Sequence, residues 1–288
     1  MPFWNPLISG NKVIELTYSD PQSGSPGSFN LYNYVNGAVA GLPGYSKVIV
    51  NIPNEYYFGA PSPTSYAFNV GNFASYQDVE INLDGYIVGH AGSGGGGGAA
   101  VPAGNFGNSG GNGQAGGRAL TNPGTSNSVT LNISPTGLLA GGGGGQGGQA
   151  SGGTVTPPTA EAPGSFSASS GSAGLGGAGW SKAPTGSFTS PATPAPRPDG
   201  PGPWSFRTSA PSGRLGQAGG PGPSNSNEYP GNSPGSGGAA GPYVVAPSTG
   251  ISKLTINHPG SRVYGPNINP AGTNHPLGSR PGGPASPT

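Results

Sequence analysis

The chain has 288 residues, of which 60 are glycine and 35 are proline. Only 7% of the residues are charged and the net charge is +1, which excludes a protein that binds nucleic acid mainly through phosphate contacts. The absence of cysteine excludes disulfides and thiolate metal sites, and no apolar run approaches the roughly 18 residues of a membrane-spanning helix.

The first 26 residues are expected to attach the protein to a larger assembly. Phe3 and Trp4, flanked by Pro2 and Pro6, are suited to packing on another chain, and packing within their own chain is the alternative. Residues 13–18 alternate well enough to predict a strand. The chain start has neither a basic stretch nor a continuous apolar stretch, so we predict no signal peptide.

A short pattern of apolar, variable, apolar and asparagine residues occurs four times along the chain. The copies are Val48–Asn51, Val79–Asn82, Val129–Asn132 and Leu254–Asn257. An apolar or aromatic pair and a glycine follow each copy, and a second short apolar segment precedes it. Repetition of this kind predicts stacked supersecondary units instead of one globular core.

The four asparagines of this pattern occupy equivalent positions. Their side chains are expected to bond to neighbouring backbone, as in stacked turns, or else to face solvent from four strands. These structural-repeat residues are Asn51, Asn82, Asn132 and Asn257.

The rest of the chain divides by composition. Residues 27–91 hold two repeats and most aromatic residues of the first half, which predicts a strand-rich base. Residues 92–265 are rich in glycine and contain variable loops, and residues 266–288 form a tail rich in proline and glycine. Glycine, proline, asparagine and β-branched residues dominate, so we expect a mainly extended protein with almost no α-helix.

Glycine tracts at 92–98, 107–117 and 141–148 have no side chains to bury. Polyglycine can order as an extended threefold helix of the polyproline II type, which has no internal hydrogen bonds. The amides and carbonyls of such a helix must pair with neighbouring chains or with water. We therefore expect the tracts to lie side by side.

Large side chains are sparse between residues 151 and 239, where proline, serine and glycine prevail. Aromatic anchors in polar, flexible surroundings are typical of binding surfaces, and the alternative is that these rings hold the glycine tracts together. The candidate receptor-binding residues are Phe166, Trp180, Phe188, Trp204, Phe206, Arg207 and Tyr229.

From Val48 to Gly98 the chain resembles the glycine-rich receptor-binding proteins at the tips of bacteriophage tail fibres. The resemblance lies in INLDGYIVGHAGSGGGGG at 81–98, in VTLNISPTGLLAGGGGGQGG at 129–148, and in the variable segments between such tracts. In that family, polyglycine II helices pack into a small lattice, and the loops between them gather at one end and bind the bacterial surface. The resemblance implies the same arrangement here.

No pattern of catalytic or metal-binding residues accompanies these features. The G-x-G-x-x-G match at 174–179 follows no strand and precedes Pro184, and the three histidines lack the spacing of a metal site. Asp78, Glu80 and Asp84 are read as a solvated face and not as a glycosidase pair. We therefore predict no enzyme activity, no catalytic residue, no metal and no cofactor.

The sequence thus predicts a phage tail-tip adhesin that recognises a host through a protein or polysaccharide on the bacterial surface. Other phage tail proteins are the expected second partner, self-association stays open, and neither nucleic acid nor membrane insertion is expected. A purely structural virion protein, at the tail tip or as a decoration, is the first alternative. An enzyme acting on surface polysaccharide is the second.

Overall fold

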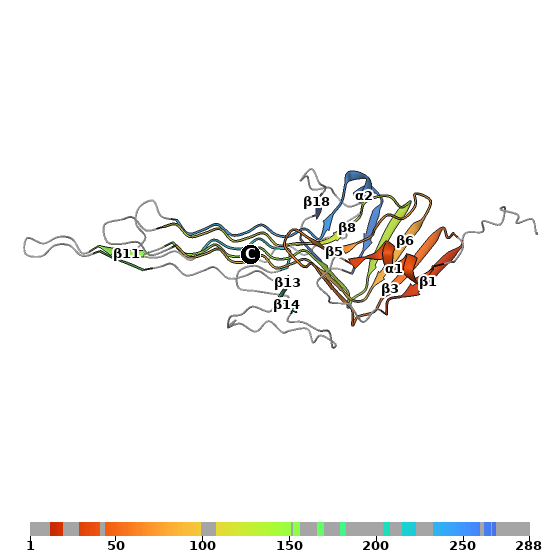
Figure 1. Ribbon diagram of the computed structural model, residues 1–288, viewed down its shortest axis with the longest axis horizontal. Helices are drawn as coiled ribbons and strands as arrows, with labels where there is room; N and C mark the ends of the chain where they lie inside the picture. The colour runs from red at the N-terminus through yellow and green to blue at the C-terminus, as the bar shows by residue number, and fades with distance from the viewer. Residues whose placement is uncertain are drawn as a thin grey trace, which may run out of the picture.

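The computed structural model describes residues 12–19, 29–40, 44–98, 108–150, 215–222, 233–259 and 262–265, and gives the backbone pairing of residues 152–155, 166–169, 179–182, 204–207 and 267–268. Across these residues the protein is mainly β, with two short helices. The larger sheets gather at one end of the molecule, and glycine-rich segments run from them toward the opposite end (Figure 1).

Three sheets, called A, B and C here, contain only parallel strand pairs. Sheet A contains β1 (Val13–Thr17), β3 (Lys47–Ile52), β6 (Asp78–Leu83), β9 (Ser128–Ile133) and β16 (Leu254–Asn257). Sheet B contains β2 (Phe29–Asn30), β5 (Tyr66–Asn69), β8 (Arg118–Thr121), β15 (Val244–Val245) and β18 (Asn267–Ile268). Sheet C contains β4 (Tyr57–Gly59), β7 (Tyr86–Val88), β10 (Leu138–Ala140) and β17 (Val263–Tyr264).

The chain visits sheets B, A and C in that order four times, so the sheets form a parallel solenoid. The four coils are β2-β3-β4, β5-β6-β7, β8-β9-β10 and β15-β16-β17. Each predicted repeat supplies one coil, and the repeated asparagines fall in register across sheet A. The prediction of stacked repeat units is therefore confirmed, and its third and fourth units lie within residues 92–265.

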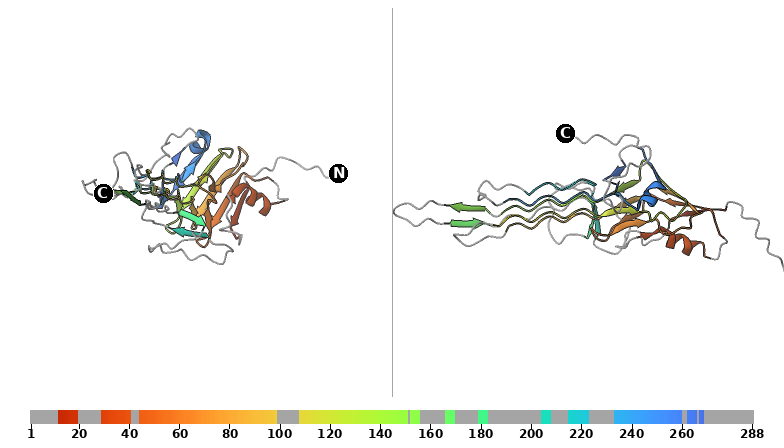
Figure 2. Two further views of the ribbon diagram at one scale, coloured as in Figure 1. Left: turned by 60° about the vertical axis from the view of Figure 1, so that its left-hand side comes forward. Right: turned by 90° about the horizontal axis from the view of Figure 1, so that it is seen from above.

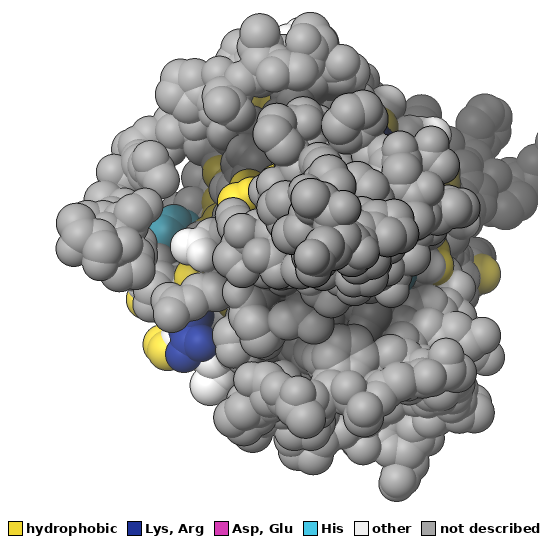
Figure 3. Space-filling model, turned by 90° about the vertical axis from the view of Figure 1, so that its left-hand side faces the viewer, with side chains coloured by type: hydrophobic (Ala, Val, Ile, Leu, Met, Phe, Trp, Pro, Cys, Tyr) yellow, Lys and Arg dark blue, Asp and Glu magenta, His cyan; other side chains and the backbone are white. Residues whose placement is uncertain are grey.

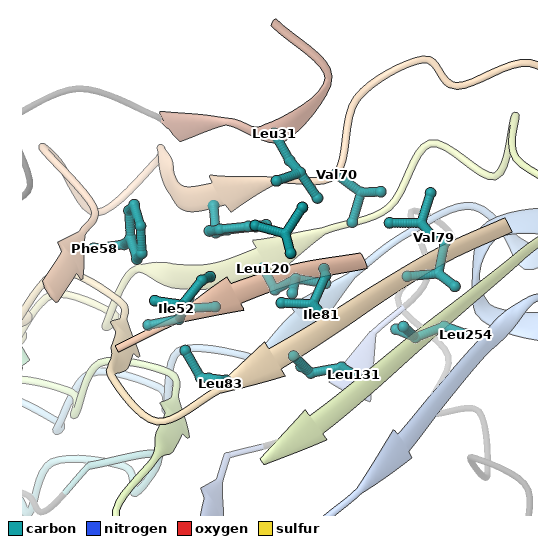
Figure 4. Close-up of a cluster of buried hydrophobic side chains, with 14 of the residues drawn as sticks. Leu31, Ile52, Phe58, Val70, Val79, Ile81, Leu83, Leu120, Leu131 and Leu254 are labelled. Carbon is teal, nitrogen blue, oxygen red and sulfur yellow. The ribbon is translucent and has the colours of Figure 1, made fainter. Parts of the chain in front are cut away.

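One hydrophobic core fills the space between the three sheets. Residues alternate between buried and half-exposed along β3, β6 and β9, as expected when one face of a strand is covered. Ile81 and Leu131 of sheet A belong to the same cluster as Leu120 of sheet B and Phe58 (Figure 4). The core closes without a disulfide because each coil buries its apolar side chains against the next.

Aromatic rings close the core at the first coil. The ring centroid of Tyr18 lies 4.8–5.3 Å from those of Phe29, Tyr34, Tyr56 and Phe58, and Tyr18 is only 2% exposed. Clusters of edge-on and tilted rings bury a large apolar area. Several of the aromatic residues of 27–91 thus cover the core at this end of the solenoid.

Two short helices, α1 (Leu31–Ala38) and α2 (Ser248–Ser252), are the α-helices of the described residues, in agreement with the prediction of almost no α-helix. In α1, the side chain of Asn30 accepts a 3.0 Å hydrogen bond from the Asn33 amide and so caps the helix start. Leu31 and Val35, four residues apart, are both buried. The apolar segment from 31 to 35 is therefore one helical face, and the strand before it ends at Asn30.

The four repeat asparagines form a ladder on the outer face of sheet A. Each side-chain amide donates to the side-chain oxygen of the asparagine one coil earlier, at 2.8–2.9 Å. The first, Asn51, donates to the Glu15 carboxylate of β1 at 2.8 Å. The side chains thus bond to one another and not to neighbouring backbone, and they fix the register of five strands.

We expect Asn82→Ala to lower the melting temperature of the protein, since it removes one bond to Asn51 and another to Asn132. A loss of about 1–3 kcal/mol would lower it by several degrees. Asn257→Ala removes one bond at the ladder end and should cost less, and Thr255→Ala on the same strand is the control. Equal melting of Asn82→Ala and Thr255→Ala would show that the ladder contributes nothing.

Candidate functional site

Five extended glycine-rich segments form the most unusual part of the structure. These glycine segments are residues 89–98, 108–117, 141–150, 215–222 and 233–241. The first two lie in the connection from β7 to β8, and the other three lie in the connection from β10 to β15. In the first coil, only residues 60–65 make the equivalent connection from β4 to β5. The glycine segments are thus insertions at one corner of the solenoid (Figure 2).

Hydrogen bonds set the directions of the segments. Along segment 89–98, Gly89, Gly92, Gly95 and Gly98 donate in turn to residues 140, 143, 146 and 149, so 89–98 and 141–150 run in the same direction. Residues 111, 114 and 117 donate to residues 96, 93 and 90, so 108–117 runs back. By the same reasoning 215–222 runs away from the sheets, in the direction of 141–150, and 233–241 runs in the opposite direction.

The hydrogen bonds recur at every third residue. Between segments 89–98 and 141–150 the four amide-to-carbonyl distances are 2.8–2.9 Å. Between segments 108–117 and 233–241, residues 110, 113 and 116 donate to residues 233, 236 and 239 at 2.8–3.1 Å. Residues three apart therefore face the same neighbour, and we call each such set a row.

Segment 141–150 lies at the centre of the group. It exchanges backbone hydrogen bonds with all four other segments. The amide of Gly142 donates to Gly117 and that of Gly144 donates to Gln217. The carbonyls of Gly143 and Gly145 accept from Gly92 and Gly238. All of its glycines are buried. The whole arrangement is therefore built around the tract that the sequence shows as GGGGGQGG.

Two of the three rows of the central segment exclude any side chain. A Cβ on residues 141, 144 or 147 would fall on the carbonyls of segment 233–241, and one on residues 142, 145 or 148 would fall on the carbonyls of residues 90, 93 and 96. Backbones can approach this closely only when no Cβ intervenes. The third row, residues 140, 143, 146 and 149, contains Ala140, Gln146 and Gln149.

Each outer segment has one row of glycines that faces another segment in the same way. These rows are Gly89, Gly92 and Gly95; Gly110, Gly113 and Gly116; Gly219 and Gly222; and Gly235, Gly238 and Gly241. The other rows carry small or polar side chains such as Ser93, Asn112 and Ser236. The strict third-residue glycine is visible in the sequence, but the expectation above relied on uninterrupted tracts and missed it.

The glycine segments carry no aspartate, glutamate, lysine or arginine, so backbone bonds and not ion pairs hold them. Figure 3 looks along the segments toward the sheets, and its coloured side chains include hydrophobic, basic and histidine groups. Within the described residues, no cluster of three or more His, Cys, Asp or Glu side chains could hold a metal ion. In the same part of the chain, neither helix has the length and apolar character needed to cross a membrane.

Five of the seven candidate receptor-binding residues lie in two small antiparallel ladders. Phe166 starts β12 (Phe166–Ser169), which pairs with β11 (Gly152–Val155). Trp180 lies in β13 (Gly179–Lys182) opposite Phe206, and Trp204, Phe206 and Arg207 lie in β14 (Trp204–Arg207). The β11–β12 ladder lies at the far end of the glycine segments, and the β13–β14 ladder lies near the sheets (Figures 1 and 2). Phe188, Tyr229, Phe3 and Trp4 lie outside the described residues.

His90 is the one ionisable side chain of the glycine segments. Its backbone carbonyl accepts a 2.6 Å bond from the Gly117 amide, where two segments leave the sheets. Its ring nitrogen Nδ1 lies 2.6 Å from the Ala91 carbonyl. Burial lowers the pKa of His90 below its usual 6.5, and the bond to Ala91 opposes this effect.

We expect Gly145→Ala to destabilise the protein strongly, because its Cβ would collide with the Ser93 carbonyl. Gly96→Ala is the matched control, since a Cβ there meets nothing within 4 Å. A compatible Gly→Ala change stabilises by about 0.4–1 kcal/mol through the unfolded chain, so Gly96→Ala should melt at or above the wild type. Thermal melts in which both variants behave alike would contradict the packing of the central segment.

We also expect the melting temperature to fall as the pH is lowered from 7.5 to 5. Because the folded state holds His90 with a lowered pKa, the unfolded state binds more protons below about pH 6.5, and protonation favours unfolding. His90→Gln should weaken this dependence. An unchanged pH profile for His90→Gln would rule out His90 as its source.

Comparison with known proteins gives one finding. A family model described as phage tail fibre adhesin Gp38 matches residues 14–273, which is most of the chain. No curated protein and no solved structure matches. The match decides among the three classes of function that the sequence left open, since the family is one of adhesins that bind a host receptor at the tail fibre tip, and not of enzymes. The chain belongs to the phage tail fibre adhesin Gp38 family.

Proposed function

We propose that the glycine segments are polyglycine II helices whose lattice holds the host-recognition loops away from the sheets. The supporting observation is the hydrogen-bond interval of three residues, which equals one turn of a polyproline II-type helix. All bonds that support this assignment run between segments, as expected for a helix without internal hydrogen bonds. Glycine at every third position supplies the close approach that such a lattice requires.

The recognition loops are the ones that begin and end at the far end of this lattice. Gly98 donates to Gln149 at 2.8 Å, Gly110 to Ser233 at 3.1 Å, and Gly222 to Gly235 at 2.8 Å, so these segment ends are neighbours. The loops at 99–107 and 223–232 and the chain that follows residue 150 therefore start from one surface. Variable loops on a rigid scaffold are the usual place for binding residues. Phe166 and Tyr229 belong to this group and are its proposed anchors.

A second set of proposed anchors consists of Trp180, Phe188, Trp204, Phe206 and Arg207. Aromatic and arginine side chains dominate the binding energy of many interfaces. The half of the chain from residue 145 carries seven basic and three acidic side chains, which suits an anionic bacterial envelope and favours encounter more than affinity. This set would meet a receptor that reaches along the side of the lattice, whether a surface protein or a polysaccharide.

The opposite end of the protein is proposed to join the virion. Residues 1–26, with Phe3 and Trp4, would contact another tail protein, and the strand-rich residues 27–91 would form the supporting base. Residues 92–265 would carry the lattice and its loops, and the tail from 266 to 288 would complete the chain end. The adhesin would act without inserting into a membrane or binding nucleic acid, and self-association is left to measurement.

Adsorption of phage carrying variant adhesins tests the proposal. Tyr229→Ala and Phe166→Ala should each reduce adsorption to host cells, by roughly 30-fold if either is a 2 kcal/mol anchor. Trp204→Ala and Arg207→Ala report on the second set, and Gly96→Ala serves as a variant that changes the lattice surface alone. A variant counts as evidence only if its melting temperature does not fall below that of the wild type.

Two results would contradict this assignment. Full adsorption by both Phe166→Ala and Tyr229→Ala, with loss in Trp204→Ala, would move recognition to the second set. Deleting residues 1–20 should leave a protein that binds cells but no longer joins the tail, and its incorporation into particles would contradict the attachment role.

A further inference from the structure

Among the described residues, two large apolar side chains are exposed, Val13 at 52% and Tyr76 at 66%. Val13 begins β1, the outermost strand of sheet A, and Tyr76 lies in the connection that leads from β5 of sheet B to β6 of sheet A. Single exposed apolar residues are common on protein surfaces, so these two carry information only if they lie together.

The register of sheet A places both residues at the same end of the sheet. Val13 pairs with Lys47, and Lys47 pairs with Asp78, so these three residues form one row across neighbouring strands. Tyr76 precedes Asp78 by two residues, and neighbouring strands lie about 4.8 Å apart, which puts the backbone of Tyr76 roughly 10–15 Å from that of Val13. We call this end of sheet A, where its strands begin after sheet B, the B–A corner.

The turn that carries Tyr76 is held by the buried Gln77. The backbone amide of Gln77 donates to the Ala74 carbonyl at 2.9 Å, and its side-chain oxygen accepts from the Ala74 amide at 2.8 Å. Its side-chain nitrogen donates to the Tyr45 carbonyl at 3.2 Å, which ties the turn to the first coil. An exposed aromatic ring on a turn fixed in this way loses little conformational freedom on binding.

Tyr76 is the exposed member of an aromatic cluster. Burial raises the pKa of the Tyr45 hydroxyl, a hydrogen bond with Gln77 opposes this effect, and the nearby hydroxyls of Tyr32 and Tyr76 raise the pKa further. The Tyr32 ring also packs edge-on against Phe73, with ring centroids 5.2 Å apart. The B–A corner therefore presents one exposed ring supported by several partly or fully buried ones.

The B–A corner carries little charge. The described residues of the first three connections from sheet B to sheet A are 31–40, 44–46, 70–77 and 122–127, and every exposed one among them is uncharged. In the row of Val13, Lys47 forms a 2.7 Å ion pair with Glu80, and the Asp78 carboxylate accepts two side-chain hydrogen bonds. Lys12 adds one half-exposed positive charge beside Val13.

The other end of sheet A has a different character. The connections from sheet A to sheet C expose the acidic residues Glu55 and Asp84. The centres of protein interfaces are enriched in aromatic residues and depleted of charged ones. The B–A corner, and not the opposite end of the sheet, therefore has the composition of an interface.

The path of the chain indicates which partner fits this corner. The Lys12 carbonyl accepts from the amides of Ser46 and Lys47 at 3.0 and 3.3 Å, so the chain enters the fold here. The residues before Lys12 include Phe3 and Trp4, to which the proposed function gives the attachment role. β1 and α1 also lie at the end of the molecule opposite the glycine segments, so a partner bound here leaves the recognition loops free (Figure 1).

We propose that the B–A corner docks on an uncharged, apolar surface of the tail protein to which the adhesin is attached. Tyr76 supplies the aromatic anchor and Val13 supplies a second apolar contact. This inference rests on the proposed attachment role of residues 1–26, and it adds the folded surface against which the partner lies.

Binding of the purified full-length adhesin to phage particles assembled without adhesin tests the proposal. Tyr76→Ala should raise the adhesin concentration needed for half-maximal incorporation about tenfold, as expected when an aromatic anchor is removed. Val13→Glu should also raise it, because the new carboxylate would be buried without a partner. Thr255→Glu, on the exposed face of the last strand of sheet A, is the control and should be incorporated like the wild type.

Because these side chains are exposed, the soluble variants should melt and adsorb to host cells much as the wild type does. Incorporation of both Tyr76→Ala and Val13→Glu at wild-type concentrations would overturn the proposal. An equal loss of incorporation in Thr255→Glu would overturn it as well, since the effect would then not depend on the B–A corner.

A double variant, Phe3→Ala with Trp4→Ala, separates a failure of this inference from a failure of the attachment role. If the double variant no longer joins particles and Tyr76→Ala joins them normally, the docking surface is wrong and the attachment role of residues 1–26 stands. If both variants join particles normally, both proposals are overturned.

Cysteine labelling gives a second measurement that does not depend on affinity. The chain has no cysteine of its own, and Ser75 beside Tyr76 and Thr255 are both exposed. Ser75→Cys and Thr255→Cys should both react with a maleimide in the free adhesin, and Ser75→Cys alone should lose its labelling in particles.

Equal labelling of the two cysteines in particles would overturn the docking surface. Protection of Ser75→Cys already in the free adhesin would also overturn it, because a second copy or another part of the same chain would then occupy the corner.

Discussion

Backbone amides that donate at every third residue hold the five glycine segments together, and the arrangement of these segments depends on this interval. Glycine loses more backbone freedom on folding than any other residue, so a single glycine segment has no reason to order alone. The central segment offsets this cost because its amides and carbonyls bond to four neighbours at once. A single Cβ added to the central segment would displace a neighbouring backbone and so weaken the hydrogen bonds of several segments together.

The solenoid supplies what the glycine segments cannot supply for themselves, which is a fixed starting position. Successive coils deliver β7 and β10 side by side in sheet C, so segments 89–98 and 141–150 leave the sheet already paired. The asparagine ladder fixes the register of the coils, and the core buries the side chains that hold the coils together. A shift of one residue in sheet A would move every glycine of the central segment out of its row.

Alternation made the strands predictable, because Val79, Ile81 and Leu83 must share one face of any strand that contains them. The repeat of this pattern identified all four coils. The helix at Leu31–Ala38 escaped prediction because it depends on capping by Asn30, a signal too short to outweigh the surrounding glycine and proline. The ladder partners of the asparagines also depend on stacking between coils, which no single repeat contains. Trp180 and Trp204 belong to the β13–β14 ladder, which lies near the sheets (Figures 1 and 2), and the sequence could not give this position because residues 151–239 carry no repeated strand pattern.

The residue types of the glycine segments have a consequence for proteolysis. None of the five segments contains lysine, arginine, phenylalanine, tyrosine or tryptophan. Trypsin and chymotrypsin cut mainly beside those residues, so they find few cleavage sites in the glycine segments. The backbone of these segments is also hydrogen-bonded to neighbouring segments, which hinders its entry into a protease active site. We therefore expect trypsin and chymotrypsin to cut these five segments slowly in the folded protein.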